Sequence, residues 1–236
     1  MKTNIPVLIP IKHFSKRCPD KNKALLPYTI RFLEQVGKLE NAVVITDSYD
    51  LLELALTYQV NAHYETREPD QDEFVSCWNY LNGKAYSSFF LCPVTQPFRS
   101  SNLIMEMEQQ YEAGKDNLDF ICSITSIPNR EIFHVVEKGS SFSFKKKSKI
   151  RKGVNCEPHL MIDGALYLIN TDFLSKVIHS KNTNTAFWSG RFTCAVNTAS
   201  FIDIDTKADM SKFEFLSSFF NDTSVERINA GLRYIG

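Results

Sequence analysis

Short apolar runs alternate with amphipathic stretches along most of the chain. Runs rich in β-branched and aromatic residues predict strands at 7–11, 42–46, 60–64, 88–92, 120–126, 165–169 and 200–204. Stretches with apolar residues three or four positions apart predict helices at 28–39, 50–59, 72–81, 102–113, 171–178 and 208–220. This alternation is typical of βαβ units, so the sequence predicts an α/β protein with a mainly parallel sheet.

Residues 128–159 interrupt the alternation. Short β-prone pieces at 132–136 and 142–144 precede a basic run from Lys145 to Lys152. We expect an inserted β-hairpin arm, covering about 128–160, within a single domain that spans 1–236. The basic run taken alone is typical of a solvated face.

Composition narrows the class of protein. The chain has 236 residues, enough for one α/β domain with a substantial core. Its 27 Lys and Arg balance 27 Asp and Glu, which argues against a nucleic-acid-coating protein. Apolar runs fall short of the ~20 residues that span a bilayer, and the start lacks a signal-peptide pattern. We therefore expect a cytoplasmic protein without a membrane or nucleic-acid partner.

Cysteines and histidines give no metal-binding pattern. The six cysteines are scattered and form no CxxC pair, and the five histidines form no HExxH motif. We expect reduced thiols and no zinc site.

The loop after the first predicted strand is rich in cations. Ser15, Lys16, Arg17, Lys21 and Asn22 follow the strand directly. In an α/β sheet, the carboxyl end of a strand is where phosphate groups usually bind. The Gly-rich Walker pattern is missing, so lysine side chains would supply the positive charge.

A second cluster stands near the carboxyl end of the chain. In a strand, Asp203 and Asp205 would share one face. Two adjacent carboxylates repel each other, and Mg²⁺ relieves that repulsion while bridging them to substrate phosphates. Alternatively, Asp205 or Thr206 caps the following helix, with Asp209 in a capping box.

Both clusters resemble motifs of the sugar-activating cytidylyltransferases, the acylneuraminate and 3-deoxy-manno-octulosonate CMP-sugar synthetases. Ser15, Lys16, Pro19, Lys21 and Asn22 match the first signature of that family. Two positions depart from it, because Lys12 stands where the family has Arg and Arg17 where it has Gly. The order Ile-Asp-Ile-Asp-Thr-x-x-Asp at 202–209 resembles the closing motif of the family.

Three further segments resemble the family. Residues 91–100 keep Pro93, Pro97 and Arg99 but carry Cys92 for Gln and Gln96 for Ser. Segment 44–48 matches around Asp47, and Arg67 follows the third strand. Segment 163–167 keeps Gly164 and Tyr167. By spacing alone, Asp47 would be a helix N-cap and Arg99 a partner in a surface ion pair.

The resemblance implies a Rossmann-like, three-layer nucleotidyltransferase fold whose arm makes a homodimer. It implies transfer of CMP from CTP to the anomeric hydroxyl of an acidic 2-keto-3-deoxy sugar, with release of pyrophosphate, in nucleotide-sugar and polysaccharide biosynthesis. The implied catalytic residues are Lys16, Lys21, Asp203 and Asp205, the last two as ligands of Mg²⁺. The implied nucleotide-binding residues are Lys12, Ser15, Lys16, Asn22, Asp47, Arg67 and Pro93. The implied sugar-binding residues are Cys92, Gln96, Arg99, Arg151 and Tyr167.

Two other functions remain open. Asp203-Ile-Asp205 also fits the DxD pattern of metal-dependent glycosyltransferases. Lys12, Arg17, Cys92 and Met161 depart from the family, which would suit a binding homologue without activity. Release of pyrophosphate separates nucleotidyl transfer from both.

Overall fold

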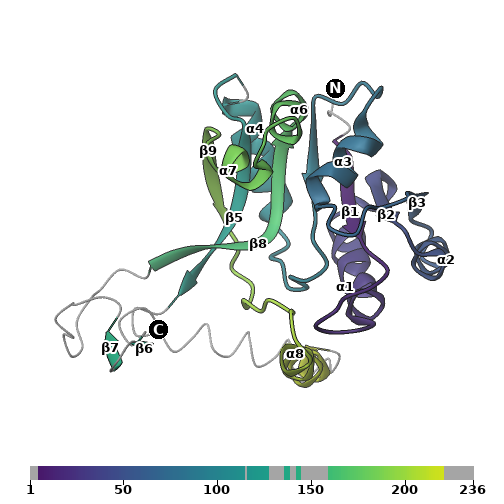
Figure 1. Cartoon of the computed structure of the whole chain (residues 1–236), viewed down its shortest axis with the longest axis vertical. Helices are drawn as coiled ribbons and strands as arrows, with labels where there is room; N and C mark the ends of the chain where they lie inside the picture. The colour runs from purple at the N-terminus through teal and green to yellow at the C-terminus, as the bar shows by residue number, and fades with distance from the viewer. Residues whose placement is uncertain (1–4, 115, 128–135, 139–141, 145–158, 221–236) are drawn as a thin grey trace.

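A seven-stranded sheet with helices on both faces forms the body of the protein (Figure 1). The computed structural model describes residues 5–114, 116–127, 136–138, 142–144 and 159–220. The strands follow the order β3-β2-β1-β4-β8-β5-β9 across the sheet. Their bounds are β1 Val7–Ile11, β2 Ala42–Thr46, β3 Asn61–Tyr64, β4 Ser88–Leu91, β5 Phe120–Ile127, β8 His159–Asn170 and β9 Phe192–Val196. The helices are α1 Lys21–Gln35, α2 Tyr49–Thr57, α3 Glu73–Leu81, α4 Leu103–Gly114, α6 Thr171–Ile178, α7 Thr183–Trp188 and α8 Lys207–Phe220, with a 3-10 turn η1 Leu39–Asn41.

The sheet is mainly parallel, as predicted. β1 pairs in parallel with β2 and β4, β2 pairs in parallel with β3, and β5 with β9. β8 is the exception, because it lies antiparallel between β4 and β5. These pairings join two parallel sets of strands through one antiparallel strand.

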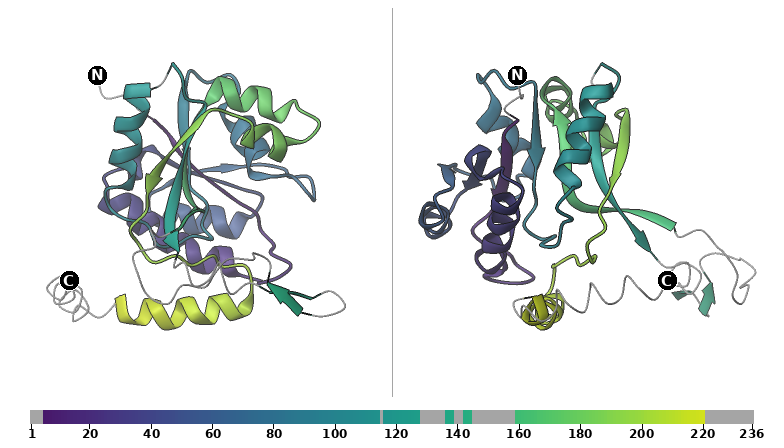
Figure 2. Two further views of the ribbon diagram at one scale, coloured as in Figure 1. Left: turned by 90° about the vertical axis from the view of Figure 1, so that its left-hand side faces the viewer. Right: turned by 180° about the vertical axis from the view of Figure 1, so that it is seen from behind.

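Two apolar layers bury the sheet, one on each face. Val7, Ile9 and Ile11 of β1 belong to the layer that includes side chains of α1, α2 and α4, while Leu8 belongs to the layer covered by α3, α6 and α7. Figure 2 shows these helices on opposite sides of the strands. Because side chains alternate along a strand, β1 has to be apolar at successive positions to be buried on both faces. The three-layer α/β arrangement expected from the sequence is confirmed.

The start of α1 differs from the sequence prediction. The helix runs over Lys21–Gln35 instead of 28–39. Asp20 takes the left-handed conformation, with φ at 61°, so the chain turns immediately before Lys21. Gly37, with φ at 67°, reverses the backbone after the helix, which leaves Leu39 in η1. Lys21 and Asn22 therefore belong to the first turn of a helix and not to a loop.

The predicted strand at 200–204 is wrong. Those residues form no strand, and the place beside β5 is taken by β9, which the sequence analysis missed. The backbone amide of Ile204 instead donates to the carbonyl oxygen of Thr95 at 3.0 Å. α7 was also missed, and β8 extends to twelve residues where five were predicted.

The predicted hairpin is present in part. β6 Val136–Lys138 and β7 Phe142–Phe144 pair antiparallel in a sheet of their own. The basic run Lys145–Lys152, including Arg151, lies outside the described residues, as does Cys156. A dimer contact through this arm stays a prediction.

The described cysteines are all unpaired by disulfides, as expected; they are Cys18, Cys77, Cys92, Cys122 and Cys194. Within the described ranges, every helix is too short or too polar to cross a membrane.

An aromatic cluster fixes α7 to the sheet. The ring of Phe187 lies 4.2 Å from that of Phe120 in β5 and 4.5 Å from that of Phe74 in α3, measured between centroids. Phe187 is fully buried. Because α7 has only six residues, this packing and not its own hydrogen bonds holds it in place.

Phe187→Ala should therefore lower the free energy of unfolding by roughly 3 to 5 kcal/mol, since it leaves a cavity between three elements. Chemical denaturation monitored by circular dichroism measures the change. Leu56→Ala, at a position more than half exposed on α2, serves as the control and should shift stability far less. Equal losses in the two variants would contradict the role assigned to Phe187.

Candidate functional site

A cavity of about 930 Å³ opens at the carboxyl ends of β1, β2 and β4. Three segments wall it: the β1–α1 loop, the segment between β3 and α3, and the loop after β4. All of the expected nucleotide-binding residues line it, namely Lys12, Ser15, Lys16, Asn22, Asp47, Arg67 and Pro93, and so does Lys21. Residues that the sequence separates by up to 81 positions are thus brought to one surface.

The β1–α1 loop forms a cationic wall. The side chains of Lys12, Lys16 and Arg17 are exposed beside the cavity, while Lys21 is buried at the first turn of α1. Four cations on one wall create a positive potential that attracts a polyanion. Phosphate binding by this loop stays a prediction.

Polar contacts hold that loop in shape. The side-chain amide of Asn22 donates to the carbonyl oxygen of Lys12 at 2.7 Å, and the backbone amide of His13 donates to Asp47 Oδ1 at 2.6 Å. Asp47 is not the N-cap that its spacing suggested, because Ser48 caps α2 by accepting from the amide of Leu51 at 3.4 Å. Asp47 and Asn22 are therefore positioned to fix the backbone beside the cavity.

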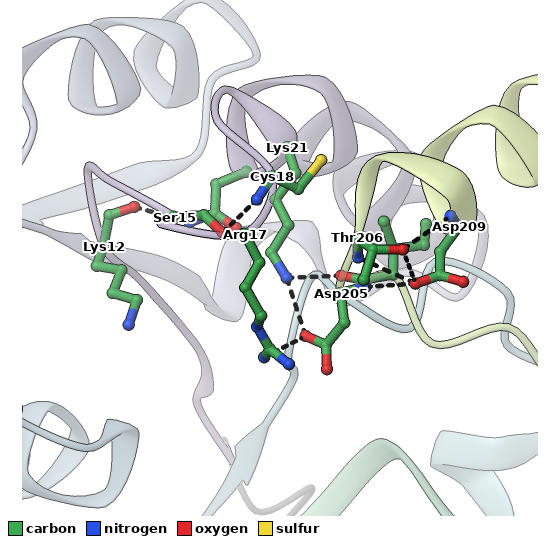
Figure 3. Close-up of polar contacts among 10 residues, drawn as sticks. Lys12, Ser15, Arg17, Cys18, Lys21, Asp205, Thr206 and Asp209 are labelled. Carbon is green, nitrogen blue, oxygen red and sulfur yellow. Dashed lines mark hydrogen bonds and ion pairs between the residues drawn. The ribbon is translucent and has the colours of Figure 1, made fainter.

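The first and the last motif of the chain meet at Asp205 (Figure 3). Lys21 Nζ donates to the carbonyl oxygen of Ile204 at 2.6 Å and lies 3.3 Å from Asp205 Oδ1. Arg17 Nη2 donates to the same carboxylate oxygen at 2.8 Å. The carboxylate of Asp205 is therefore drawn toward the cationic loop.

Thr206 and not Asp205 caps the last helix. The amide of Asp209 donates to Thr206 Oγ1 at 3.3 Å, and the amide of Thr206 donates to Asp209 Oδ2 at 3.0 Å. This reciprocal pair is the capping box that the sequence indicated. The Thr206 hydroxyl donates to Asp209 Oδ2 at 2.7 Å, and this bond, followed by the bond from the Thr206 amide, holds the pKa of Asp209 below its usual value. The amide of Asp205 also donates to Asp209 Oδ2 at 3.4 Å, but its side chain takes no part in the cap and is available for another role.

Neither Asp203 nor Asp205 is among the residues that line the large cavity, and Asp203 lies beside a different one. Its side chain borders a second, smaller cavity of about 460 Å³ together with Asp209 and residues of α8. Burial, and next the charge of Asp205, raise the pKa of Asp203. The described part of the chain contains no group of three or more His, Cys, Asp or Glu placed to hold a metal ion. Mg²⁺ often takes one or two protein carboxylates plus substrate phosphates, a role that Asp203 and Asp205 fit chemically, and a magnesium site here stays a prediction.

The expected sugar-binding residues divide into two groups. Cys92 and Arg99 are buried and do not line the large cavity. Arg99 Nε donates to the carbonyl oxygen of Ala165 at 2.8 Å, Nη1 to Thr29 Oγ1 at 3.3 Å, and Nη2 to the carbonyl oxygen of Pro93. The alternative of a surface ion pair for Arg99 is wrong, because this side chain ties three elements together inside the protein.

Gln96 and Tyr167 do come together. A Cβ atom at Gly164 would lie 3.7 Å from the Tyr167 hydroxyl and 3.9 Å from Gln96 Cγ, so both side chains converge on this glycine. Gly164 has φ at 70°, which explains why glycine stands there. Its neighbour Asp163 is buried and accepts hydrogen bonds from Ser123 Oγ and from Asn197 Nδ2, the latter at 2.8 Å.

The sequence analysis missed the acidic residues that line the cavity together with the lysines. Glu68, Asp70, Asp72 and Glu73 line the cavity between β3 and α3. The signal in the sequence is the acidic run directly after Arg67. Arg67 itself lies 3.4 Å from Glu65 Oε1 in a buried ion pair, measured from Nε. The cavity therefore has one cationic wall and one acidic wall.

No family model matches the chain. Its sequence is 26% identical over 223 residues to the N-acylneuraminate cytidylyltransferase of Escherichia coli O18:K1:H7, covering 89% of the chain and 51% of that protein. The chain thus spans about half the length of this curated relative. Its fold is similar to that of CMP:2-keto-3-deoxy-manno-octonic acid synthetase complexed with CTP, with a TM-score of 0.65, 16% identity, and coverage of 91% and 98% of the two chains. It is also similar to a cytidylyltransferase from Leptospira borgpetersenii, with a TM-score of 0.60, 13% identity, and coverage of 88% and 84%.

Arg99→Leu should destabilise the fold by roughly 3 kcal/mol, because it leaves two buried carbonyl groups and one hydroxyl without a donor. The midpoint of urea unfolding measures this. Arg31→Leu, at an exposed position of α1, is the matched control and should change the midpoint little. A normal midpoint in Arg99→Leu would show that Arg99 does not brace the fold.

Proposed function

We propose that this chain is a cytidylyltransferase of the CMP-sugar synthetase kind, which transfers CMP from CTP to the anomeric hydroxyl of an acidic 2-keto-3-deoxy sugar. One observation carries the proposal: the eight residues expected to bind the nucleotide or its phosphates line a single cavity with a cationic wall. The relatives supply the substrate class, since their names record cytidylyl transfer to acylneuraminate or to 2-keto-3-deoxy-manno-octonic acid.

In this proposal the triphosphate lies along the lysine wall. The anomeric oxygen attacks the α-phosphorus, a new phosphorus–oxygen bond forms, and the bond to the β-phosphate breaks to release pyrophosphate. Lys12, Lys16 and Arg17 offset the charge on the phosphate oxygens from the exposed side of the wall, and Lys21 does so from its buried position. Catalysis here comes from alignment and from fixed positive charge.

Asp203 and Asp205 would hold Mg²⁺ when CTP is bound. The ion would neutralise phosphate charge and lower the pKa of the attacking hydroxyl. Without substrate, Arg17 and Lys21 pair with Asp205 and balance its charge. Lys21 also keeps the carbonyl of Ile204 in place, so it positions the backbone between the two carboxylates.

Gln96 and Tyr167 are the described residues proposed to contact the sugar, with Gly164 between them leaving space for it. Arg99 would position these residues without touching the sugar, because its hydrogen bonds to the carbonyls of Pro93 and Ala165 hold the loop after β4 against β8. Cys92 supports the same region from the core.

Incubation with CTP, Mg²⁺ and a panel of nonulosonic and octulosonic acids tests the function directly. Pyrophosphate release that depends on one of these acids supports cytidylyl transfer. A glycosyltransferase would instead consume a nucleotide-sugar without making pyrophosphate. A binding homologue would bind CTP but release no pyrophosphate with any acid.

Lys16→Ala should reduce turnover by about two to three decades, because a phosphate contact made in the transition state contributes roughly 2 to 4 kcal/mol. Steady-state pyrophosphate release measures this. Lys23→Ala is the matched control: Lys23 is an exposed lysine of α1 that does not line the cavity, and its replacement should leave turnover unchanged. Full turnover in Lys16→Ala would remove the loop from the mechanism.

Asp203→Asn and Asp205→Asn should each lower turnover strongly and raise the Mg²⁺ concentration needed for half-maximal rate, because each removes a charged ligand. Electron paramagnetic resonance of bound Mn²⁺ in the presence of CTP provides a readout independent of activity. Asp209→Asn disturbs the capping box instead, so it should lower thermal stability without altering Mn²⁺ binding. Unchanged Mn²⁺ affinity in both of the first two variants would exclude them as ligands.

A further inference from the structure

The two walls of the cavity carry opposite charge. Lys12, Lys16 and Lys21 line the cavity from the β1–α1 segment, and the acidic segment 68–73 lines it from between β3 and the start of α3. A nucleoside triphosphate is attracted by the first wall and repelled by the second. The phosphates therefore belong beside the lysines, and the base is directed toward the segment between β3 and α3.

Glu73 differs from the other acidic residues of that segment. Asp72 is occupied, because it accepts from the amide of Val75 at 3.0 Å and from Thr183 Oγ1 at 2.9 Å. Glu68 and Asp70 are exposed. Glu73 is recessed and lines the cavity, and within the described part of the chain no residue hydrogen-bonds or forms an ion pair with its carboxyl group. This leaves a recessed acceptor with unused capacity at the place where the base would lie.

The surroundings of Glu73 disfavour its charge. Burial and the neighbouring Asp72 raise its pKa to about 7, while Arg67 and Lys12 act in the opposite direction. Burial, and next the charge of Glu73, raise the pKa of Cys77 on the same helix and of Tyr167 on β8. An incoming hydrogen-bond donor would favour the charged form.

Cytosine and uracil differ at the position that such a group can distinguish. Cytosine carries a 4-amino group, which donates, whereas uracil carries a 4-oxo group, which accepts. We propose that Glu73 selects cytosine over uracil by accepting a hydrogen bond from the 4-amino group of the base. This inference rests on the proposed function, because it assigns the base specificity of the same site.

The selection depends on the charge state of the carboxyl group. Ionised Glu73 accepts from cytosine and repels the 4-oxo group of uracil, whereas protonated Glu73 can donate to that oxygen. Below pH 7 the protonated form prevails, so discrimination weakens, and above pH 7 it strengthens. The ratio of the two affinities isolates this effect, because titration of the triphosphate and of the lysine wall affects both nucleotides alike.

Isothermal titration calorimetry with CTP and with UTP, in Mg²⁺ and without any sugar acid, tests the proposal. For the unaltered protein, the ratio of the UTP to the CTP dissociation constant should rise by about tenfold between about pH 6 and about pH 8. In Glu73→Gln the amide can donate or accept, so the ratio should approach unity and lose its pH dependence. Glu53→Gln, an exposed change on α2, should keep the ratio of the unaltered protein.

Each outcome decides the matter. If the ratio of the UTP to the CTP dissociation constant is independent of pH in the unaltered protein, the inference is overturned without any variant. A Glu73→Gln variant that keeps the original ratio, or one that loses both nucleotides equally, also overturns it. In those cases pyrophosphate release would still support the proposed function. An unaltered protein that binds neither nucleotide overturns both.

Discussion

The side chain of Lys21, near the start of the chain, contacts Ile204 and Asp205, near the end of the described residues. Its ammonium group is buried, and a buried charge is tolerated when it is paired and hydrogen-bonded. Ile204 supplies the carbonyl acceptor at 2.6 Å and Asp205 the opposite charge at 3.3 Å. Because Lys21 begins α1 and Asp205 precedes α8, one side chain sets the distance between the cationic β1–α1 loop and Asp205. The geometry of the proposed catalytic centre depends on this contact.

A second polar network holds the region around Gln96 and Tyr167. Arg99 connects the loop after β4 to strand β8, and Asp163 accepts hydrogen bonds from Ser123 and Asn197. The side chains of Arg99 and Asp163 are both buried, so their hydrogen bonds hold this region from inside the protein. Such an arrangement holds the buried Gln96 and the partly buried Tyr167 in a fixed frame, which favours precise orientation of a bound molecule.

The sequence predicted the elements whose signals are local. Helices cover both faces of β1 and β2, so both strands are buried at successive positions and not only at alternate ones. Their bounds match the prediction. The prediction of a strand at 200–204 was wrong. Ile202 and Ile204 alternate with carboxylates as in a strand, but β9 is the segment that pairs with β5. A local sequence pattern does not show which of two segments will pair with a given strand.

The candidate site shows the same limit. Motif order predicted the residues that line the cavity, since each motif follows its own strand. The meeting of Lys21 with Asp205 joins positions 184 apart, and no local signal encodes it. Burial of Cys92 and Arg99 could not be read from their spacing either, because a loop residue can face inward or outward. Glu73 was overlooked because an acidic run between two elements is typical of a solvated turn.

The antiparallel β8 has a consequence for the order in which the protein assembles. Strands β1 to β4 all lie within the first 91 residues, yet one edge of β4 is paired by a strand that ends at Asn170. During synthesis from the amino terminus, the apolar β4 therefore leaves an open sheet edge until β8 has emerged. Open apolar edges pair readily with other chains. The nascent protein would thus be most prone to aggregation midway through translation, and its two parallel sets of strands become one sheet only when β8 closes the gap between them.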